Sequence, residues 1–251
     1  MESLANFFVS RNYETQVVPL SSCGAVAPQA IDVLPAASTA DDLTGQILWP
    51  VARATAAFVA AEGARGALPR GGAALELGAG CGIVALVASR FVSSVWLTDG
   101  EDEILPLMER NLAHAAPGCA AHAAVLRWGD AGDAAALASA AGRARWPVLL
   151  GADVVYWPQG IDPLCATVAA LLAADGVFYL GYNDRLPGNR QALERGLHAR
   201  GLCAVIVPLE SVDVADLHDA AREKITLFKI TWSAAARAAW LEAGEAHEAA
   251  I

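Results

Sequence analysis

Residues 75–83, Leu-Glu-Leu-Gly-Ala-Gly-Cys-Gly-Ile, decide the fold. An apolar strand ends at Leu77, the chain turns on alternating glycines, and a helix begins at Ile83. Glycines in such a turn adopt positive φ and let the backbone approach a ligand closely. In an open parallel sheet, the carboxyl end of the first strand lies at the topological switch point, where ligands bind. The stretch therefore predicts an α/β fold with a ligand site at the turn. A tight strand–helix connection without a ligand is the alternative.

The chemistry of this turn favours one class of cofactor. The dinucleotide fingerprint GxGxxG needs its third glycine where this chain has Ile83, and Gly78, Gly80 and Gly82 form GxGxG instead. Glu76 stands two residues before the first glycine, where its carboxylate would repel a diphosphate. The same carboxylate would attract the ammonium group of an amino-acid moiety, by roughly 1 kcal/mol or more. The turn thus favours S-adenosylmethionine over NAD or FAD.

Outward from the turn, apolar strands alternate with helices. Such alternation predicts a mostly parallel sheet covered by helices on both faces. The expected strands are Ala73–Leu77, Ser94–Thr98, Ala123–Arg127, Pro147–Ala152, Val177–Tyr182, Leu202–Val207 and Lys224–Trp232. The expected helices between them are Ile83–Arg90, Asp102–Ala115, Asp133–Ala141, Asn189–Arg200 and one whose apolar positions run from Ile161 to Leu172.

The two ends of the chain differ from this pattern. Residues 1–43 contain two strand-like runs, Thr15–Leu20 and Ala30–Leu34, which predict a hairpin or arm. A helix is expected from Thr44, with Pro50 in its first turn and Gly63 at its C-terminus. Residues 44–232 then form the main domain, and the tail, 233–251, is expected to be a loose terminal helix.

Three further positions follow strands and can border the ligand. Asp99 lies 23 residues after Glu76, the spacing of an acid that accepts both ribose hydroxyls. Trp128 can pack against the adenine, and Asp130 can accept hydrogen bonds from its amino group. The alternatives are a helix cap at Asp99, a core Trp128 and an ordinary turn aspartate at Asp130.

The fourth strand ends in Asp153-Val-Val-Tyr156, which faces the expected methyl-donor site. An acid and a ring at that point can receive an amine-bearing substrate. A strand-end aspartate in a turn is the alternative. Trp49 can contact the ligand or act as a hydrophobic staple, and Asn183–Arg185 can line the substrate mouth or form a solvated loop.

Composition excludes several classes of protein. The 251 residues have a net charge of −10, are 55% hydrophobic and 18% charged, and so can bury a core. The acidic balance argues against a nucleic-acid binder, whose phosphate contacts need clustered Lys and Arg. Five Cys and five His form no CxxC or HExxH pattern, so we expect no metal site and no disulfide framework. Without a signal peptide or membrane span, we expect a cytoplasmic protein, or one also found in the nucleus, and a monomer.

The motifs together resemble a known family. ELGAGCGI, the preceding GQILWPVA, LTDG with Asn111 after it, RWGD and GADVVYW occur in the order found in the class I, seven-β-strand non-histone protein-lysine methyltransferases of the family-16 type. That family includes the calmodulin, elongation factor 2 and chaperone methyltransferases. The resemblance covers roughly residues 44–232. It implies a Rossmann-like sheet of strand order 3-2-1-4-5-7-6, with the seventh strand antiparallel.

The resemblance also implies roles. The three glycines and Asp99 hold S-adenosylmethionine, Trp128 flanks the adenine, and Asp153 and Tyr156 border the lysine channel. Asp153 would then attract and orient the lysine of a protein substrate. The alternatives are a methyltransferase for small molecules or other protein residues, a non-catalytic partner protein, and a nicotinamide-dependent oxidoreductase. Nucleic-acid methylation is disfavoured, because DVVY stands where an NPPY-like tetrapeptide would be expected.

Overall fold

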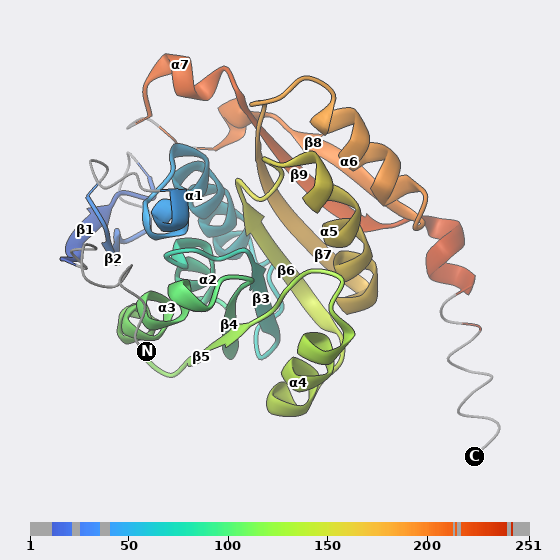
Figure 1. The fold of residues 1–251 in the computed structure, drawn as a ribbon, viewed down its shortest axis with the longest axis horizontal. Helices are drawn as coiled ribbons and strands as arrows, with labels where there is room; N and C mark the ends of the chain where they lie inside the picture. The colour runs from blue at the N-terminus through green and yellow to red at the C-terminus, as the bar shows by residue number, and fades with distance from the viewer. Residues whose placement is uncertain are drawn as a thin grey trace.

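A seven-stranded sheet between two layers of helices forms the body of the computed structural model, which describes residues 12–21, 26–35, 41–212, 214, 217–239 and 242 (Figure 1). The sheet order is β5-β4-β3-β6-β7-β9-β8, and β9 runs antiparallel to both its neighbours. This confirms the predicted order. The strands are β3 (Ala73–Leu77), β4 (Ser94–Asp99), β5 (Ala120–Val125), β6 (Trp146–Ala152), β7 (Leu172–Asn183), β8 (Leu202–Val207) and β9 (Ile225–Trp232).

Each face of the sheet has its own apolar core. Helices α1 (Pro50–Ala64), α2 (Ile83–Ala88) and α3 (Leu105–Asn111) cover one face, where Phe58 meets the ring of Tyr179 edge-on at 5.4 Å. Helices α4 (Ala131–Ala141), α5 (Pro158–Leu171) and α6 (Asn189–His198) cover the other face. Burial on both faces explains why the central strands are continuous apolar runs.

The predicted N-terminal hairpin is present. Strand β1 (Glu14–Val18) pairs antiparallel with β2 (Gln29–Val33) in a separate two-stranded sheet. The apolar side chains of Val18, Ile31 and Val33 join the core that α1, α2 and α3 share. Residues 1–11 of the predicted arm lie outside the described residues. In the tail, residues 234–239 are helical, and beyond them the structure describes residue 242 alone.

Two expected helix boundaries were wrong. The expected helix Asp102–Ala115 is divided into η3 (Asp102–Ile104), α3 and η4 (Leu112–His114). Pro106 lies in the first turn of α3, the position where a proline is tolerated, so a new helix starts there. The helix expected from Thr44 starts instead at Pro50, because residues 41–46 form the 3-10 helix η2 (Asp41–Gln46). Gly63 lies inside α1 rather than after it.

Two strands begin earlier than expected. Strand β5 starts at Ala120 rather than Ala123, and β7 starts at Leu172 rather than Val177. Alanine-rich segments carry little strand preference of their own, so pairing with the neighbouring strand decides where they become extended. Short elements η5 (Leu209–Ser211) and α7 (Asp219–Arg222) connect β8 to β9. In the described part of the chain, no helix is long and apolar enough to cross a membrane.

Candidate cofactor and substrate site

The backbone at all three glycine positions of the turn after β3 requires a residue without a side chain. Gly78, Gly80 and Gly82 have φ values of +62°, +52° and +85°, in the left-handed region that other residues rarely adopt. A methyl group on Gly82 would lie 2.2 Å from Cδ2 of Leu97, which belongs to β4. The turn is therefore closed tightly against the sheet, and its glycines have the positive φ that the sequence predicted.

Other segments approach this turn from outside. A methyl group on Gly80 would lie 2.4 Å from the carbonyl oxygen of Gly45, so η2 passes directly over the turn. A methyl group on Gly78 would lie 2.8 Å from Val154 and 3.0 Å from the ring of Trp128. The structure thus brings the segments after β5 and β6 to the same turn. These contacts place Trp128 beside the glycine turn; its stacking on an adenine remains a prediction.

Glu76 lies beneath the turn. Its side chain is 2% exposed, and Oε2 accepts a hydrogen bond of 2.7 Å from the backbone N–H of Ala85 in α2. Burial raises the pKa of Glu76 to about 8, and the nearby charge of Asp99 acts in the same direction. The carboxyl group thus holds the start of α2 against β3. Its contact with a ligand ammonium remains a prediction.

Asp99 fastens the glycine turn to β4. Its Oδ2 accepts a 3.0 Å hydrogen bond from the N–H of Gly80, and its Oδ1 accepts one of 3.2 Å from Glu101. Burial raises the pKa of Asp99, although these backbone hydrogen bonds oppose the shift. Asp99 therefore lies at the turn, where the spacing placed it. Its contact with ribose hydroxyls remains a prediction.

Asp130 has a clear structural role. It is the N-cap of α4, and its Oδ1 accepts hydrogen bonds from Gly132 and Asp133 at 2.8 and 2.9 Å. Such capping satisfies N–H groups that have no partner inside the helix. The alternative of a turn aspartate therefore accounts for this residue, and its contact with an adenine remains only a prediction.

Asp153 is already paired with a cation. Nε of Arg185 donates to its Oδ1 at 3.1 Å, and Nη2 of Arg185 donates to its Oδ2. The same guanidinium lies over the ring of Trp49, with Cζ 4.8 Å from the ring centroid. Sequence reasoning did not predict this cationic partner, and the contact of Asp153 with a substrate lysine remains a prediction. Trp49 lies at this ion pair, and its own Nε1 donates to the carbonyl of Thr44 at 2.9 Å.

The backbone of Asp153 is unusual. Among the described residues it is the one non-glycine with positive φ, at +59°. Its N–H donates to the carbonyl of Gly181 at 3.0 Å, which holds it against the end of β7. Strained backbone of this kind costs of order 1–3 kcal/mol and is concentrated at functional sites.

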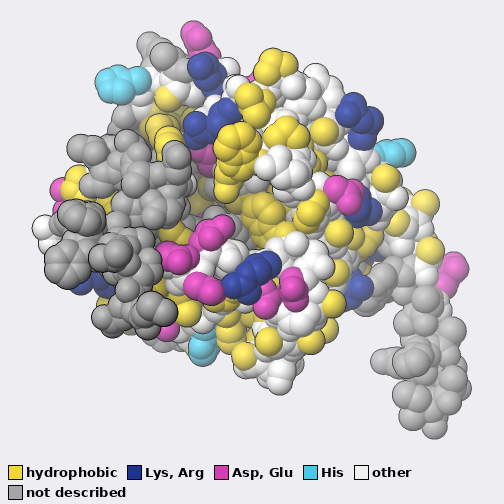
Figure 2. Space-filling view, in the orientation of Figure 1, with side chains coloured by type: hydrophobic (Ala, Val, Ile, Leu, Met, Phe, Trp, Pro, Cys, Tyr) yellow, Lys and Arg dark blue, Asp and Glu magenta, His cyan; other side chains and the backbone are white. Residues whose placement is uncertain are grey.

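Tyr156 stands beside the paired aspartate. We call the exposed edge of the site formed by Tyr156, Trp157 and the Asp153–Arg185 pair the rim. Its side chain is 46% exposed and contacts the ring of Trp157, which is 58% exposed, at 6.2 Å. Burial of its inner part raises the pKa of Tyr156, and the charges of Asp99, Glu101 and Asp153 add to the shift. The phenol therefore lies within reach of acids from the ends of both β4 and β6, as expected for one shared edge. Figure 2 shows acidic and basic side chains gathered on the middle of one molecular face, next to apolar surface.

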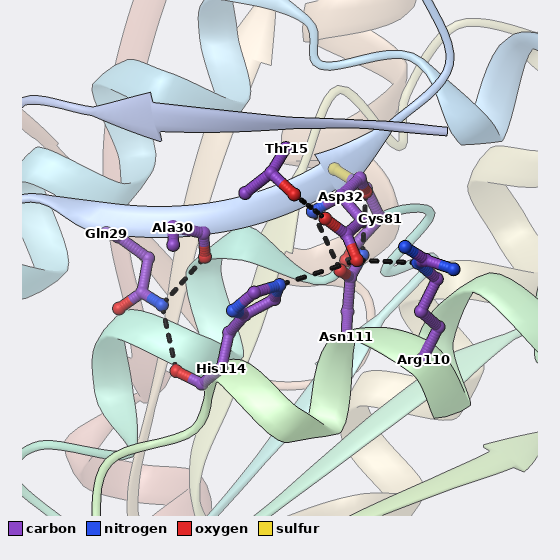
Figure 3. A network of polar contacts seen from close by, with 8 residues as sticks. All are labelled: Thr15, Gln29, Ala30, Asp32, Cys81, Arg110, Asn111 and His114. Atoms are coloured by element: carbon purple, nitrogen blue, oxygen red, sulfur yellow. Dashed lines mark hydrogen bonds and ion pairs between the residues drawn. The ribbon is translucent and has the colours of Figure 1, made fainter. Parts of the chain in front are cut away.

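A polar network connects the hairpin to the glycine turn (Figure 3). Asn111, at the end of α3 and fully buried, accepts a hydrogen bond from the N–H of Asp32 at 2.8 Å. Its Nδ2 donates to the carbonyl of Asp32 at 2.9 Å and to the carbonyl of Cys81 at 2.8 Å. Sequence reasoning noted Asn111 only as a motif residue. Its role depends on a partner 79 positions away, which no local pattern reveals.

Asp32 carries the other half of this network. Thr15 donates to its Oδ1 at 2.5 Å, Nε of Arg110 donates to its Oδ2 at 2.6 Å, and His114 lies 3.5 Å from the same oxygen. Burial alone would raise the pKa of Asp32, but the hydrogen bonds from Thr15 and Arg110 outweigh it and lower the pKa. The carboxylate therefore stays charged and ties β2 to α3.

The described residues contain no group of three or more His, Cys, Asp or Glu side chains that could hold a metal ion. The site instead consists of a glycine turn, strand-end acids, two tryptophans and an arginine–aspartate pair. These groups offer hydrogen bonds, charges and aromatic rings, which suit an organic ligand.

Comparison with known proteins adds two findings. The profile of a protein family described as lysine methyltransferase matches residues 32–195, about two thirds of the chain. The fold is similar to that of a TehB-like SAM-dependent methyltransferase from Corynebacterium glutamicum, with a TM-score of 0.50 and 16% identity over 70% of this chain and 88% of that chain. It is also similar to SMU.776, solved in complex with SAH, with a TM-score of 0.55 and 11% identity over 88% of this chain and 56% of that chain. At such identities, the likeness to solved structures concerns the fold.

Proposed function

Because this chain belongs to the lysine methyltransferase family, we propose that it transfers a methyl group from S-adenosylmethionine to a lysine side chain of a non-histone protein. The coarser activity, S-adenosylmethionine-dependent methyl transfer, follows from the family. The finer statement, a protein lysine as acceptor, is our proposal. The observation that carries it is the paired Asp153 beside the exposed ring of Tyr156, next to the glycine turn.

The glycine turn fits the proposed methyl donor. Gly78 and Gly80 let neighbouring segments pack closely around the turn, and Asp99 and Trp128 border the same turn. These residues, with Trp49 and Glu76 nearby, would hold the donor. When bound, S-adenosylmethionine supplies a methyl group on a cationic sulfur; transfer breaks the S–C bond, forms an N–C bond and leaves a neutral thioether.

The remaining work of the protein is to present an amine in its neutral form. A free lysine has a pKa of about 10.4, so it must release its proton to solvent before its lone pair can attack. Partial burial at the rim favours the neutral form of an amine. Tyr156 offers an apolar wall with a polar tip, which suits the aliphatic stem of a lysine. After the transfer, the methylated nitrogen carries the positive charge and leaves the site as an ammonium group.

A protein acceptor is supported by the exposure of the rim. The rings of Tyr156 and Trp157 are 46% and 58% exposed, which leaves them available to a macromolecule. Exposed aromatic side chains are common anchors of protein interfaces. A small-molecule acceptor is the second candidate, since the same donor site would serve it.

Calorimetry and a labelling assay test the proposal. The protein should bind S-adenosylmethionine and not NADH. With S-adenosylmethionine labelled in its methyl group, a lysate should give labelled protein bands, and mass spectrometry should find the methyl group on lysine. Label in small molecules alone would replace the protein acceptor by the second candidate. Absence of binding would refute the methyltransferase reading altogether.

A substitution at Asp153 tests whether the rim takes part in methyl transfer. Asp153→Asn preserves the left-handed backbone, which asparagine tolerates, but removes the charge that holds Arg185. It should leave binding of S-adenosylmethionine nearly unchanged and strongly reduce methyl transfer. Asp162→Asn is a matched control, because Asp162 on α5 pairs with another arginine, Arg200, which follows α6. Full activity of the Asp153 variant would remove this residue from the mechanism.

A further inference from the structure

We propose that Arg185 is a charge-balancing residue of the methyl-transfer site: it neutralises Asp153, so that an entering amine meets an ion pair rather than a free carboxylate. The inference rests on the proposed function and deepens it. It assigns to Arg185 a positioning role that acts through Asp153, and it reverses the expectation that Asp153 itself receives a cationic lysine.

The geometry shows that Arg185 is held in place rather than resting loosely on the surface. Two different nitrogens of its guanidinium bond the two oxygens of Asp153, the bidentate arrangement that is both strong and directional. The ring of Trp49 lies against the same guanidinium. The Asp153 side chain is 8% exposed and that of Arg185 is 34% exposed, so the pair is partly shielded from solvent.

The backbone holds the other half of the pair. Asp153 keeps a left-handed conformation, and its N–H bonds Gly181 in β7, two residues before β7 ends at Asn183. Arg185 follows that same strand end, and its own N–H bonds the carbonyl of Asn183. Two strand ends thus bring the acid and the base together. The sequence separation of 32 residues explains why local pattern did not pair them.

The chemistry of methyl transfer explains why such a pair is useful. A free carboxylate near the amine would stabilise the ammonium form, whose lone pair is occupied by a proton. An opposite charge within about 4–6 Å shifts a pKa by about 1–3 units. The rim already carries Asp99 and Glu101, whose charges act on Tyr156 together with that of Asp153. A guanidinium bound to Asp153 cancels part of this negative field.

Two ligands that differ in charge at the transfer point can measure this field without an acceptor protein. S-adenosylhomocysteine has a neutral sulfur there, whereas sinefungin has a carbon in place of the sulfur and a primary amine in place of the methyl group; the nucleoside and amino-acid parts are the same. The ratio of their dissociation constants, measured by calorimetry at neutral pH, therefore reports how strongly the site favours a cation. Both ligands are titrated into the full chain, and S-adenosylhomocysteine serves as the internal control for folding.

Arg185→Gln should shift this ratio in favour of sinefungin by roughly tenfold or more, because it leaves the charge of Asp153 unbalanced. Arg185→Lys keeps a cation and should stay near the wild-type ratio. Arg200→Gln is the matched control, since it removes a guanidinium from the ion pair with Asp162 on α5, and it should not change the ratio. Adding Asp153→Asn to Arg185→Gln should return the ratio towards the wild-type value.

The outcomes separate the two proposals. If the wild-type protein binds neither ligand, the proposed function fails. If it binds both, but Arg185→Gln leaves the ratio unchanged or shifts it towards S-adenosylhomocysteine, the proposed function stands and the role of Arg185 is refuted. A variant that weakens both ligands equally also refutes it, since that result indicates a purely structural contact.

Discussion

Replacing Gly80 by alanine tests whether the approach of η2 to the glycine turn defines the cofactor site. The added Cβ would lie 2.4 Å from the carbonyl oxygen of Gly45, where ordinary contact begins at 3.4 Å. Both groups belong to the backbone, so no side-chain rotation can relieve the overlap. The turn and η2 must therefore separate by about 1 Å, a displacement of the size that can reduce activity by about a hundredfold.

A matched control separates the cost of the left-handed conformation from the cost of the overlap with Gly45. A left-handed conformation costs alanine roughly 1–2 kcal/mol wherever it occurs. Gly142, the C-cap of α4, has φ of +63° and no atom within 4 Å of an added Cβ, so Gly142→Ala carries this cost alone. For Gly80→Ala we add about 1–3 kcal/mol for the overlap. The free energy of unfolding should therefore fall by about 2–5 kcal/mol for Gly80→Ala and by about 1–2 kcal/mol for Gly142→Ala.

Denaturant unfolding and calorimetry with S-adenosylhomocysteine provide the two measurements. We expect Gly80→Ala to lose at least roughly tenfold in affinity, whereas Gly142→Ala binds like the wild-type protein. Equal stability and equal affinity of the two variants would show that η2 moves aside without consequence. The contact between Gly45 and Gly80 would then have no part in forming the site.

Further predictions concern the buried polar groups. Asn111→Asp sets a carboxylate against the carbonyls of Asp32 and Cys81 and removes two buried hydrogen bonds. The free energy of unfolding, measured in denaturant, should fall by about 3–5 kcal/mol. A loss below about 1 kcal/mol would contradict the network. The pKa of Glu76 in the folded protein is about 8, above its ordinary 4.5. The stability that protonated Glu76 contributes to the fold is therefore complete below pH 4.5 and is lost as the pH rises to about 8. The wild-type protein should therefore lose stability across that window relative to Glu76→Gln, and parallel pH profiles of the two proteins would refute the shift. If the ligand ammonium approaches Glu76, binding of S-adenosylmethionine at neutral pH should release the proton of the Glu76 carboxyl group. Binding enthalpies measured in buffers of different ionisation enthalpy report this release, and Glu76→Gln should abolish it.

The strands and their alternation with helices could be predicted because their signals are local, whereas the order of the sheet came from the family resemblance. Each central strand is a short apolar run, and the turn at Gly78–Gly82 marks the first of them. Boundaries were predicted less well where the chain is alanine-rich, as in β5, because alanine does not distinguish helix from strand strongly. There, pairing with β4 decides the register. The break between η3 and α3 falls at Pro106, in the first turn of α3.

The site was predicted in position but less well in its contacts. Strand ends placed Asp99, Trp128, Asp153 and Tyr156 along one edge, and the contacts and charges at that edge agree with this. The partner of Asp153 could not be predicted, because Arg185 follows another strand and Asp153 itself adopts a left-handed conformation. Side-chain pairing across strand ends depends on loop conformation, which no period of the sequence reports.

The hairpin of β1 and β2 pairs with no strand of the large sheet, yet Asn111 joins it to Cys81 inside the glycine turn. The family profile likewise begins at residue 32, within β2, and not at residue 44. A shortened chain that starts at residue 44 would retain the whole seven-stranded sheet but leave Asn111 with unsatisfied buried groups. Amide protection in hydrogen exchange should therefore rise in β2 when a ligand occupies the turn, because the two open as one cooperative unit. For expression or fusion, the smallest useful protein begins before Glu14, at the start of the hairpin.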